Sequence, residues 1–274
     1  MPEYISLIQN NLSNLLQLAL DAGKAILEVY ETAFSVELKD DRSPLTLADK
    51  RSNEILCKGL AGIGGIPIMS EEIKQLAYEE RKSWKSFWLV DPLDGTKEFI
   101  KRNGEFTVNI ALIEGNEPVF GLIYVPVTGQ FYYALKGQGA YTFSLSGLHA
   151  TIPGSHAEII ATSKKLPTEH RPEGEFNIVA SRSHMSPKTE AYINDEKGKH
   201  AVVNIVSAGS SLKFCLVAEG KADAYPRFGP TMEWDTGAGH IIATETGKKL
   251  VRCDTMDALT YNKPNLLNPD FLVY

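Results

Sequence analysis

An apolar strand that runs into an acidic turn, at residues 88–96, is the feature that most constrains this chain. Trp88-Leu89-Val90 has the composition of a strand, and Asp91-Pro92-Leu93-Asp94-Gly95 follows with two carboxylates three residues apart. Pro92 cannot donate a ladder hydrogen bond and ends the strand, while Gly95 lets the backbone approach a ligand closely. Such a turn can present oxygen ligands to a divalent cation and amides to a phosphate. It can equally be an ordinary polar turn, since Asp, Pro and Gly are frequent turn formers.

Three other segments also carry acids. Glu71 and Glu72 follow a short apolar run, Asp49 follows Leu47, and Asp235 stands beside Trp234 before a run of small residues. Asp49 falls in the first turn of a predicted helix, where an acid is often only a favourable partner of the helix dipole. The sequence therefore offers acids on four separate segments, and spacing alone does not prove that they meet.

Composition limits the class of protein. The chain has 274 residues, of which 43% are apolar and 23% charged, which is ordinary for a soluble globular protein of one large or two coupled domains. The net charge of −6 argues against a nucleic-acid polymer as the main partner, because no basic stripe offsets the acids. Three widely spaced cysteines predict reduced thiols. With no basic leader and no apolar run of about 18 residues, we expect a cytoplasmic protein without a transmembrane segment.

Hydrophobic periodicity predicts two α/β halves. Apolar residues at helical spacing predict an amphipathic helix over residues 1–30 and a second helix from about Leu47. After the acidic turn, β-rich runs separated by turn residues predict antiparallel hairpins, at 106–114, 119–127 and 130–135. Beyond Pro153-Gly154, short strands alternate with helices. The strands are predicted at 176–180, 202–206 and 222–225, and the helices at 187–193, 211–218 and 234–246. These patterns place the boundary near residue 154, with most candidate metal ligands in 1–154, and Asp235 and the candidate substrate contacts in 155–274.

The acids suit magnesium if the fold brings them together. Mg²⁺ prefers oxygen ligands in octahedral geometry and is usually held by a few carboxylates plus substrate phosphate. Such ions can polarise a phosphoryl group and lower the pKa of a bound water. Thr96 with Asp49 is a candidate pair for orienting that water.

The combination of Glu71, the run Asp91-Pro92-Leu93-Asp94-Gly95-Thr96 and Trp234-Asp235 resembles the signature segments of the inositol monophosphatase superfamily. Its members are lithium-sensitive, magnesium-dependent phosphatases, and the resemblance spans nearly the whole chain. It implies a layered α-β-α-β-α sandwich of the sugar-phosphatase type. It also implies metal binding by Glu71, Asp91, Asp94, Asp235 and the Leu93 carbonyl, and water activation by Thr96 and Asp49, with Glu71 also counted as catalytic. One departure is Thr236-Gly237-Ala238-Gly239, where many members carry adjacent alanines.

Within the superfamily the chain is most similar to 3′(2′),5′-bisphosphate nucleotidases of the CysQ type, which serve sulfur metabolism. The similarity lies in residues 94–106, in Ser181-Arg182-Ser183-His184, in Gly209-Ser210-Ser211-Leu212-Lys213 and in Tyr225-Pro226-Arg227. It implies substrate contacts from Gly95, Thr96, His184, Ser210, Lys213, Arg227 and Asp235. Each has an ordinary alternative: Lys213 can be a solvated helical residue, and His184 a turn residue.

We therefore expect a Mg²⁺-dependent phosphatase that converts adenosine 3′,5′-bisphosphate to AMP and phosphate. Its partner is a small phosphorylated nucleotide rather than a nucleic-acid polymer, and its location is cytoplasmic, free or peripheral to the inner membrane. The alternatives are an inositol or sugar monophosphatase on the same fold and a metal-binding regulatory module without turnover.

Overall fold

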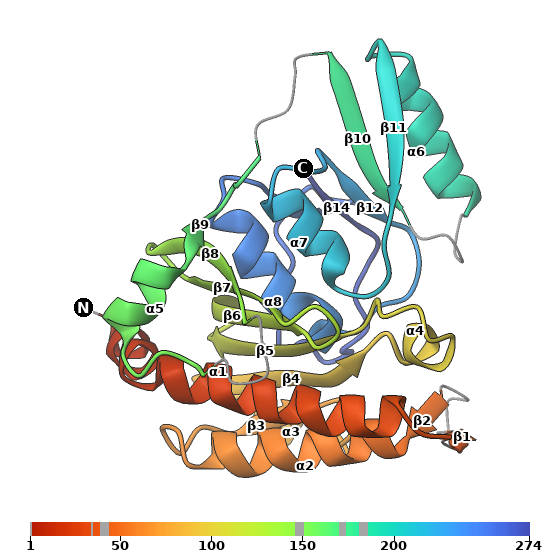
Figure 1. Ribbon diagram of the computed structural model, residues 1–274. Coiled ribbons are helices and arrows are strands. Elements are labelled where there is room, and N and C mark those ends of the chain that lie inside the picture. The colour runs from red at the N-terminus through yellow and green to blue at the C-terminus, as the bar shows by residue number, and fades with distance from the viewer. Residues whose placement is uncertain (1, 34, 39–43, 146–150, 170–173, 181–185) are drawn as a thin grey trace.

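The central element is a seven-stranded sheet in the order β3-β4-β5-β6-β7-β8-β9, in which β3 and β4 are parallel and all other neighbours antiparallel (Figure 1). The computed structural model describes residues 2–33, 35–38, 44–145, 151–169, 174–180 and 186–274. The strands are β3 (Ile68–Ser70), β4 (Ser86–Asp94), β5 (Thr107–Glu114), β6 (Glu117–Val125), β7 (Gln130–Leu135), β8 (Gly139–Ser144) and β9 (Lys164–Lys165). The predicted hairpins at 106–135 are confirmed.

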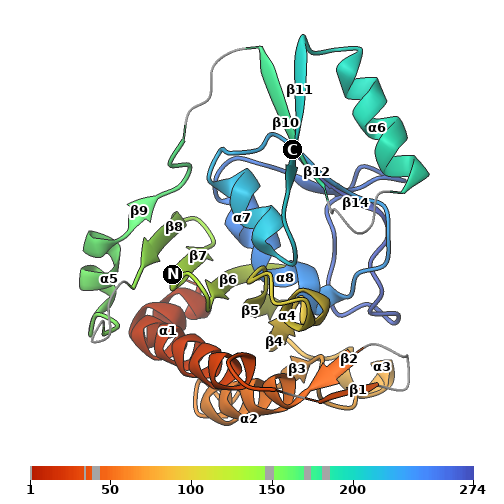
Figure 2. The ribbon, with the colours of Figure 1, turned by 45° about the vertical axis from the view of Figure 1, so that its right-hand side comes forward.

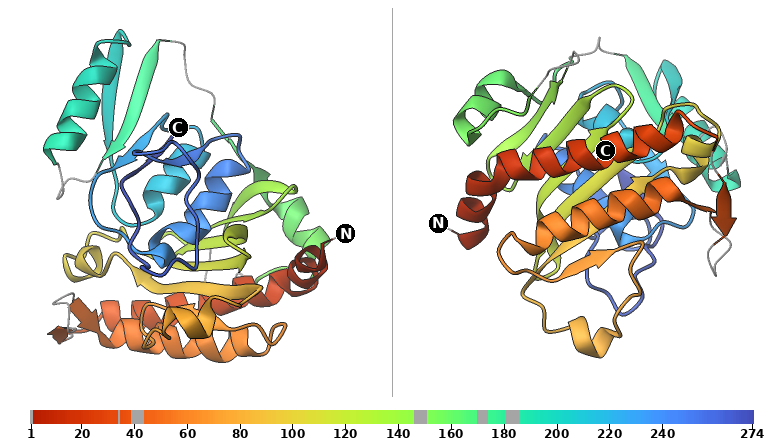
Figure 3. Two further views of the ribbon diagram at one scale, coloured as in Figure 1. Left: turned by 180° about the vertical axis from the view of Figure 1, so that it is seen from behind. Right: turned by 60° about the horizontal axis from the view of Figure 1, so that its bottom comes forward.

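Both faces of this sheet are covered, which explains the continuous apolar runs of its central strands. In β4, Trp88 and Val90 pack in a core with α1 (Glu3–Tyr30) and α2 (Leu47–Ala61). Leu89, between them in sequence, points to the opposite core with Ile241. Strand residues alternate between faces, so a strand covered on both sides is apolar throughout. Figure 3 shows α1 and α2 side by side across one face of the sheet. The predicted N-terminal helix is confirmed, and Asp49 lies in the first turn of α2.

The opposite face carries α7 (Leu212–Ala218) and α8 (Glu233–Thr244), followed by a second sheet. That sheet combines β10 (Glu175–Ala180) and β11 (Val202–Ser207), which are parallel, with the antiparallel set β12 (Tyr225–Arg227), β14 (Phe271–Val273) and β13 (Leu250–Arg252). A single bridge between Ile178 and Ala224 joins the two parts. Helix α6 (Pro187–Lys197) forms the outermost layer (Figure 2). The order of layers is therefore α-β-α-β-α, as expected.

The shorter elements lie at the margins of these layers. They are β1 (Val36–Leu38), β2 (Pro44–Thr46), α3 (Tyr78–Arg81), α4 (Thr96–Ile100) and α5 (His156–Thr162). The strand expected at 222–225 is wrong in its bounds, because it runs from Tyr225 to Arg227 and only Ala224 before it makes a single bridge. Ala222 N–H instead donates to the Leu216 carbonyl at the end of α7, so Ala222 belongs to the connection that precedes the strand. None of the described helices has the length and apolar character needed to cross a membrane.

Candidate active site

The acidic turn of β4 lies where the strand pairing is irregular. The register between β4 and β5 shifts between Asp91 and Asp94, so that the strand bends there. Asp91 is buried, and its Oδ1 accepts a hydrogen bond from Leu93 N at 3.0 Å. Ser52 Oγ donates to the Pro92 carbonyl at 2.7 Å, which fixes the turn to α2. Gly95 follows with φ of 92°, a left-handed conformation that favours glycine, and directly precedes α4.

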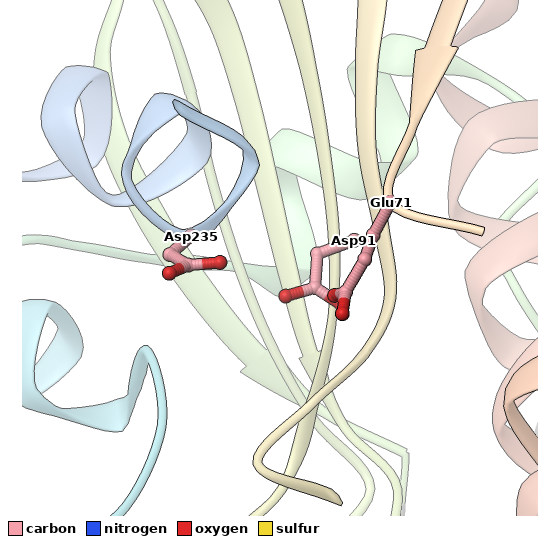
Figure 4. A group of neighbouring side chains, drawn as sticks. All are labelled: Glu71, Asp91 and Asp235. Atoms are coloured by element: carbon pink, nitrogen blue, oxygen red, sulfur yellow. The ribbon is translucent and has the colours of Figure 1, made fainter. Parts of the chain in front are cut away.

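Glu71 and Asp235 approach Asp91 from different elements. Glu71 follows β3, and its N–H donates to the Val90 carbonyl at 3.1 Å, which continues the parallel pairing beside Asp91. Asp235 lies in the first turn of α8, where its Oδ2 accepts from Met232 N at 2.9 Å. One carboxylate oxygen from each of the three acids lies within 4.8 Å of the other two. Figure 4 shows Asp235 directed from the helix toward the adjoining Asp91 and Glu71.

This convergence is electrostatically costly. Burial, followed by the charges of Glu71, Asp94 and Asp235, raises the pKa of Asp91 well above its ordinary value. Burial and then the charge of Asp94 likewise raise the pKa of Asp235. Buried like charges disfavour ionisation of each other, so the group needs a compensating cation.

The charge of Asp94 acts on Asp91 and Asp235, but Asp94 is not one of the three acids whose oxygens lie closest together. Its Oδ2 accepts hydrogen bonds from Ser211 Oγ at 2.6 Å and from Asn109 Nδ2 at 3.4 Å. Asn109 also donates to Ser211 Oγ at 2.9 Å, and Ser211 Oγ lies 3.1 Å from the Asp235 carbonyl. The side chain of Asp94 is thus held between β5 and the residue preceding α7.

Thr96 and Asp49 do meet. Thr96 Oγ1 lies 3.2 Å from Asp49 Oδ1 and 3.3 Å from the Leu93 carbonyl, and it can donate its proton to either oxygen. The second oxygen of Asp49 accepts from Thr46 N at 2.7 Å and from Thr46 Oγ1 at 2.6 Å. Asp49 is only 1% exposed. Its fixed carboxylate therefore orients the Thr96 hydroxyl, which lines the cavity described next.

A cavity of about 720 Å³ opens over the acids. Its lining includes Gly95, Ser210, Lys213 and Arg227 as well as the three clustered acids and Asp94. Lys213 is buried and its Nζ donates to the Ser210 carbonyl at 2.7 Å. Burial lowers the pKa of Lys213 to about 8, and the charge of Arg227 lowers it further while that of Asp94 opposes the shift.

Two donors in the lining of this cavity lack partners. Arg227 Nη2 donates to the Pro230 carbonyl at 3.0 Å, but the buried Nε of Arg227 and the buried Oγ of Ser210 have no hydrogen-bond partner among the described residues. Buried unpaired polar groups are rare and call for an explanation such as a ligand. The solvated alternative for Lys213 is therefore wrong, because this lysine is buried against the cavity.

His184, with the Ser181–Ser183 run, lies outside the described residues. Sequence reasoning missed Asn109, although its place between apolar residues of β5 marks it as a buried polar side chain. It also missed Arg81, Glu233 and Asn262, which are buried polar residues below the cluster. Their sequence neighbours show no pattern that would have identified them.

The donor set fits a hard cation. Glu71, Asp91 and Asp235 supply oxygen ligands only, and Asp94 adds a fourth nearby charge, a combination that suits Mg²⁺ more than a softer metal. The raised pKa values of Asp91 and Asp235 point the same way, because a divalent ion would remove the repulsion that raises them.

Comparison with known proteins agrees with this geometry. The model of the inositol monophosphatase family matches residues 9–270. The 3′(2′),5′-bisphosphate nucleotidase CysQ of Salmonella typhimurium is 43% identical over 96% of this chain and 98% of its own length. The protein of the same name from Escherichia coli K12 is 40% identical over the same shares.

Solved structures give the same result. The crystal structure of CysQ from Bacteroides thetaiotaomicron is 48% identical, covers 97% of each chain and superposes with a TM-score of 0.87. The suhB protein of Bartonella henselae, at 22% identity and a TM-score of 0.72, shares the fold. The chain belongs to the inositol monophosphatase family.

Proposed function

We propose that this chain is a Mg²⁺-dependent 3′(2′),5′-bisphosphate nucleotidase that removes the 3′-phosphate of adenosine 3′,5′-bisphosphate to give AMP and phosphate. The observation that carries the proposal is the composition of one cavity. The cavity is lined by the acids and also by Lys213, Arg227 and Ser210, which together form what we call its basic end, and the buried Arg227 Nε and Ser210 Oγ have no partner among the described residues. A substrate with two phosphates would satisfy both ends. The curated relatives that bear this name support the assignment.

The acids would hold the metal. We assign Glu71, Asp91, Asp94 and Asp235, with the Leu93 carbonyl, as ligands. A bound Mg²⁺ supplies charge neutralisation on the phosphate and lowers the pKa of a bound water. Glu71, Asp94 and Asp235 are half-buried whereas Asp91 is buried, so these three acids can contact solvent as well as metal.

The chain's own contribution to hydrolysis is to orient water. Asp49 accepts the Thr96 proton at 3.2 Å, which leaves a lone pair of Thr96 Oγ1 to accept a hydrogen bond from a water in the cavity. Gly95 and Thr96 open α4, and the amides of a first helical turn have no partner within the helix. These amides would receive the oxygens of the phosphate that is cleaved.

The basic end would bind the phosphate that is retained. Arg227 Nε and Ser210 Oγ are free to donate to it, and Lys213 adds charge. His184 remains a proposed contact to the nucleoside. We place the enzyme in the cytoplasm, and nothing in the described residues supports attachment to a membrane.

A substrate panel tests this function. Phosphate release from adenosine 3′,5′-bisphosphate, inositol monophosphate and a simple monophosphate is measured with Mg²⁺ and with a chelator. We expect turnover only with Mg²⁺, a preference for the bisphosphate, and inhibition by Li⁺. A preference for inositol phosphate would favour a sugar monophosphatase instead, and binding without turnover would indicate a regulatory module.

Two variants test the basic end. Arg227→Ala and Lys213→Ala should lower kcat/KM for the bisphosphate by about 10- to 150-fold, the loss expected for one charge-assisted hydrogen bond of roughly 1.5–3 kcal/mol. The simple monophosphate has no second phosphate to lose contact with, so its kcat/KM should change little. Equal losses on both substrates would contradict the assignment of these residues to the retained phosphate.

A further inference from the structure

Two of the clustered acids reach the site on segments that depend on a distant part of the chain. Glu71 begins the segment between β3 and β4, and Asp235 begins α8. Neither segment is paired with the other in a sheet. The loop from Leu259 to Asn268, between β13 and β14, contacts both, and its hydrogen bonds show how.

Arg81 holds the Glu71 segment. It ends α3 and is 2% exposed, yet it makes no ion pair with an acid of the described chain. Its Nη1 donates to Asn262 Oδ1 at 2.6 Å, and its Nη2 donates to the carbonyls of Lys263 at 2.7 Å and Pro264 at 3.2 Å. This arginine therefore fastens the end of α3 to the loop through neutral oxygens.

Asn262 connects Arg81 to Glu233 through its side-chain amide and its backbone N–H. Its Nδ2 donates back to the Arg81 carbonyl at 2.9 Å, so both ends of the amide are engaged by one residue. Its backbone N–H donates to Glu233 Oε2 at 2.7 Å. The residue is left-handed, with φ of 62°, a conformation that asparagine tolerates better than most side chains.

Glu233 anchors the start of α8. Its carboxylate is fully buried and also accepts from Lys263 N at 2.9 Å and Lys263 Nζ at 2.6 Å. Its own N–H donates to the Leu266 carbonyl at 3.0 Å. Asn268 Nδ2 donates to the Met232 carbonyl at 2.8 Å. The first turn of α8, which contains Asp235, is therefore hydrogen-bonded to the same loop that binds Arg81.

We propose that Asn262 is a positioning residue for the carboxylate cluster. It joins Arg81, ten residues after Glu71, to Glu233 at the head of α8, and through Glu233 it sets the position of Asp235 relative to Glu71, which is itself held by the Val90 carbonyl. The inference rests on the proposed function only in naming Mg²⁺ as the ion. It makes the affinity for Mg²⁺ depend on an amide that contacts none of the three acids.

The test is calorimetric titration of the metal-free protein with Mg²⁺, well below the unfolding temperature, so that turnover plays no part. Asn262→Gly retains the left-handed backbone and the N–H to Glu233 but removes both contacts with Arg81. We expect the Mg²⁺ dissociation constant to rise about 10-fold, the lower end of the range for groups that orient metal ligands indirectly.

Met256→Gly is the matched control, because Met256 also has φ of 62° but is 56% exposed. It should bind Mg²⁺ as the native chain does. Asn262→Asp retains an oxygen to accept from Arg81 and should bind Mg²⁺ at least about 3-fold more tightly than Asn262→Gly. If Asn262→Gly fails to fold, Arg81→Lys tests the same link, since lysine keeps the charge but lacks the fork of donors.

The outcomes separate the positioning role of Asn262 from the proposed function. Native affinity in Asn262→Gly, with or without a lower unfolding temperature, would overturn the positioning role and leave the proposed function standing. Equal affinities in the Asp and Gly variants would overturn the role of the Arg81 contact. Absence of Mg²⁺ binding by the native chain would overturn both the positioning role and the metal in the proposed function.

Discussion

At the scale of single residues, the acids that suit a metal weaken the fold that carries them. Asp91 and Asp235 have raised pKa values because burial and neighbouring acids penalise their charged forms. A carboxyl whose pKa is higher in the folded than in the unfolded state binds a proton more readily when folded. Its contribution therefore makes the metal-free protein lose stability as pH rises above the ordinary carboxyl range, up to the raised pKa.

The variant Asp91→Asn separates the contribution of Asp91 to activity from its effect on stability. We expect it to lower kcat/KM more than about 100-fold, since even residues that orient ligands indirectly cost 10- to 100-fold. The metal-free variant should be more stable than the native chain near pH 7 by roughly 1–3 kcal/mol, because the amide carries no charge among the remaining acids. Urea unfolding in a chelator, as a function of pH, measures this. A loss of stability in the variant would contradict the electrostatic account.

Lys213 predicts a second pH effect, on substrate preference rather than on stability. Its pKa is lowered to about 8, so the ammonium is present below pH 8 and is lost as pH rises through that value. The ratio of kcat/KM for the bisphosphate to that for a simple monophosphate should fall above pH 8. Lys213→Arg, which keeps its charge, should hold the ratio constant through pH 9. A ratio that falls equally in both proteins would assign the effect to another group.

At the scale of elements, the position of α8 depends on glycines at its contacts. A Cβ on Gly239 would lie 2.3 Å from the ring of Phe214 on α7, and one on Gly237 would lie 2.9 Å from Leu89 of β4. These small residues let α8 approach both neighbours closely. The contacts with Phe214 and Leu89 explain why glycines stand in the run Thr236-Gly237-Ala238-Gly239, where many family members carry adjacent alanines.

Gly239→Ala should therefore destabilise the protein. Alanine favours a helix interior over glycine by about 1 kcal/mol, but overpacking costs about 1–3 kcal/mol, so the clash with Phe214 decides the sign. Gly62→Ala is the control, because Gly62 has φ of −80° and its nearest contact would be 3.4 Å away. Denaturant unfolding should show a loss for Gly239→Ala and no loss for Gly62→Ala. A gain for Gly239→Ala would mean that the α7 contact yields readily.

At the scale of the whole molecule, Mg²⁺ should behave as a stabilising ligand. A ligand that binds only the folded state at 100 times its dissociation constant adds about 2.7 kcal/mol, which at about 2–4 °C per kcal/mol raises the unfolding temperature by roughly 5–11 °C. Differential scanning calorimetry with Mg²⁺ and with a chelator measures the shift. Asp235→Asn should remove most of it, and an undiminished shift in that variant would place the stabilising ion elsewhere.

The sequence predicted individual helices and strands because their patterns are local, whereas the order of the layers was implied by the family resemblance. Helical periodicity identified α1, and β-rich runs identified β5 to β7. The acids were predictable because each follows a recognisable strand end or helix start. Asn262 and Arg81 were not, since they are 181 residues apart and their pairing depends on the finished fold. The division at residue 154 stays a prediction, and α8 from the second part packs on the sheet of the first.

The acids of the cluster leave the ribosome at different times, because they lie on segments far apart in the sequence. Asp91 is synthesised well before Asp235, and the loop that holds the head of α8 and the strand Phe271–Val273 follow Asp235 in the chain. Translation at about 5–20 residues per second separates Asp91 from Phe271 by roughly 9–36 s. Until Asp235 is synthesised the nascent chain carries Glu71 and Asp91 without their third partner, and for the rest of that interval it lacks part of the segment that holds the head of α8. The proposed Mg²⁺ ligands are therefore held in place together only after the loop between β13 and β14 has been synthesised.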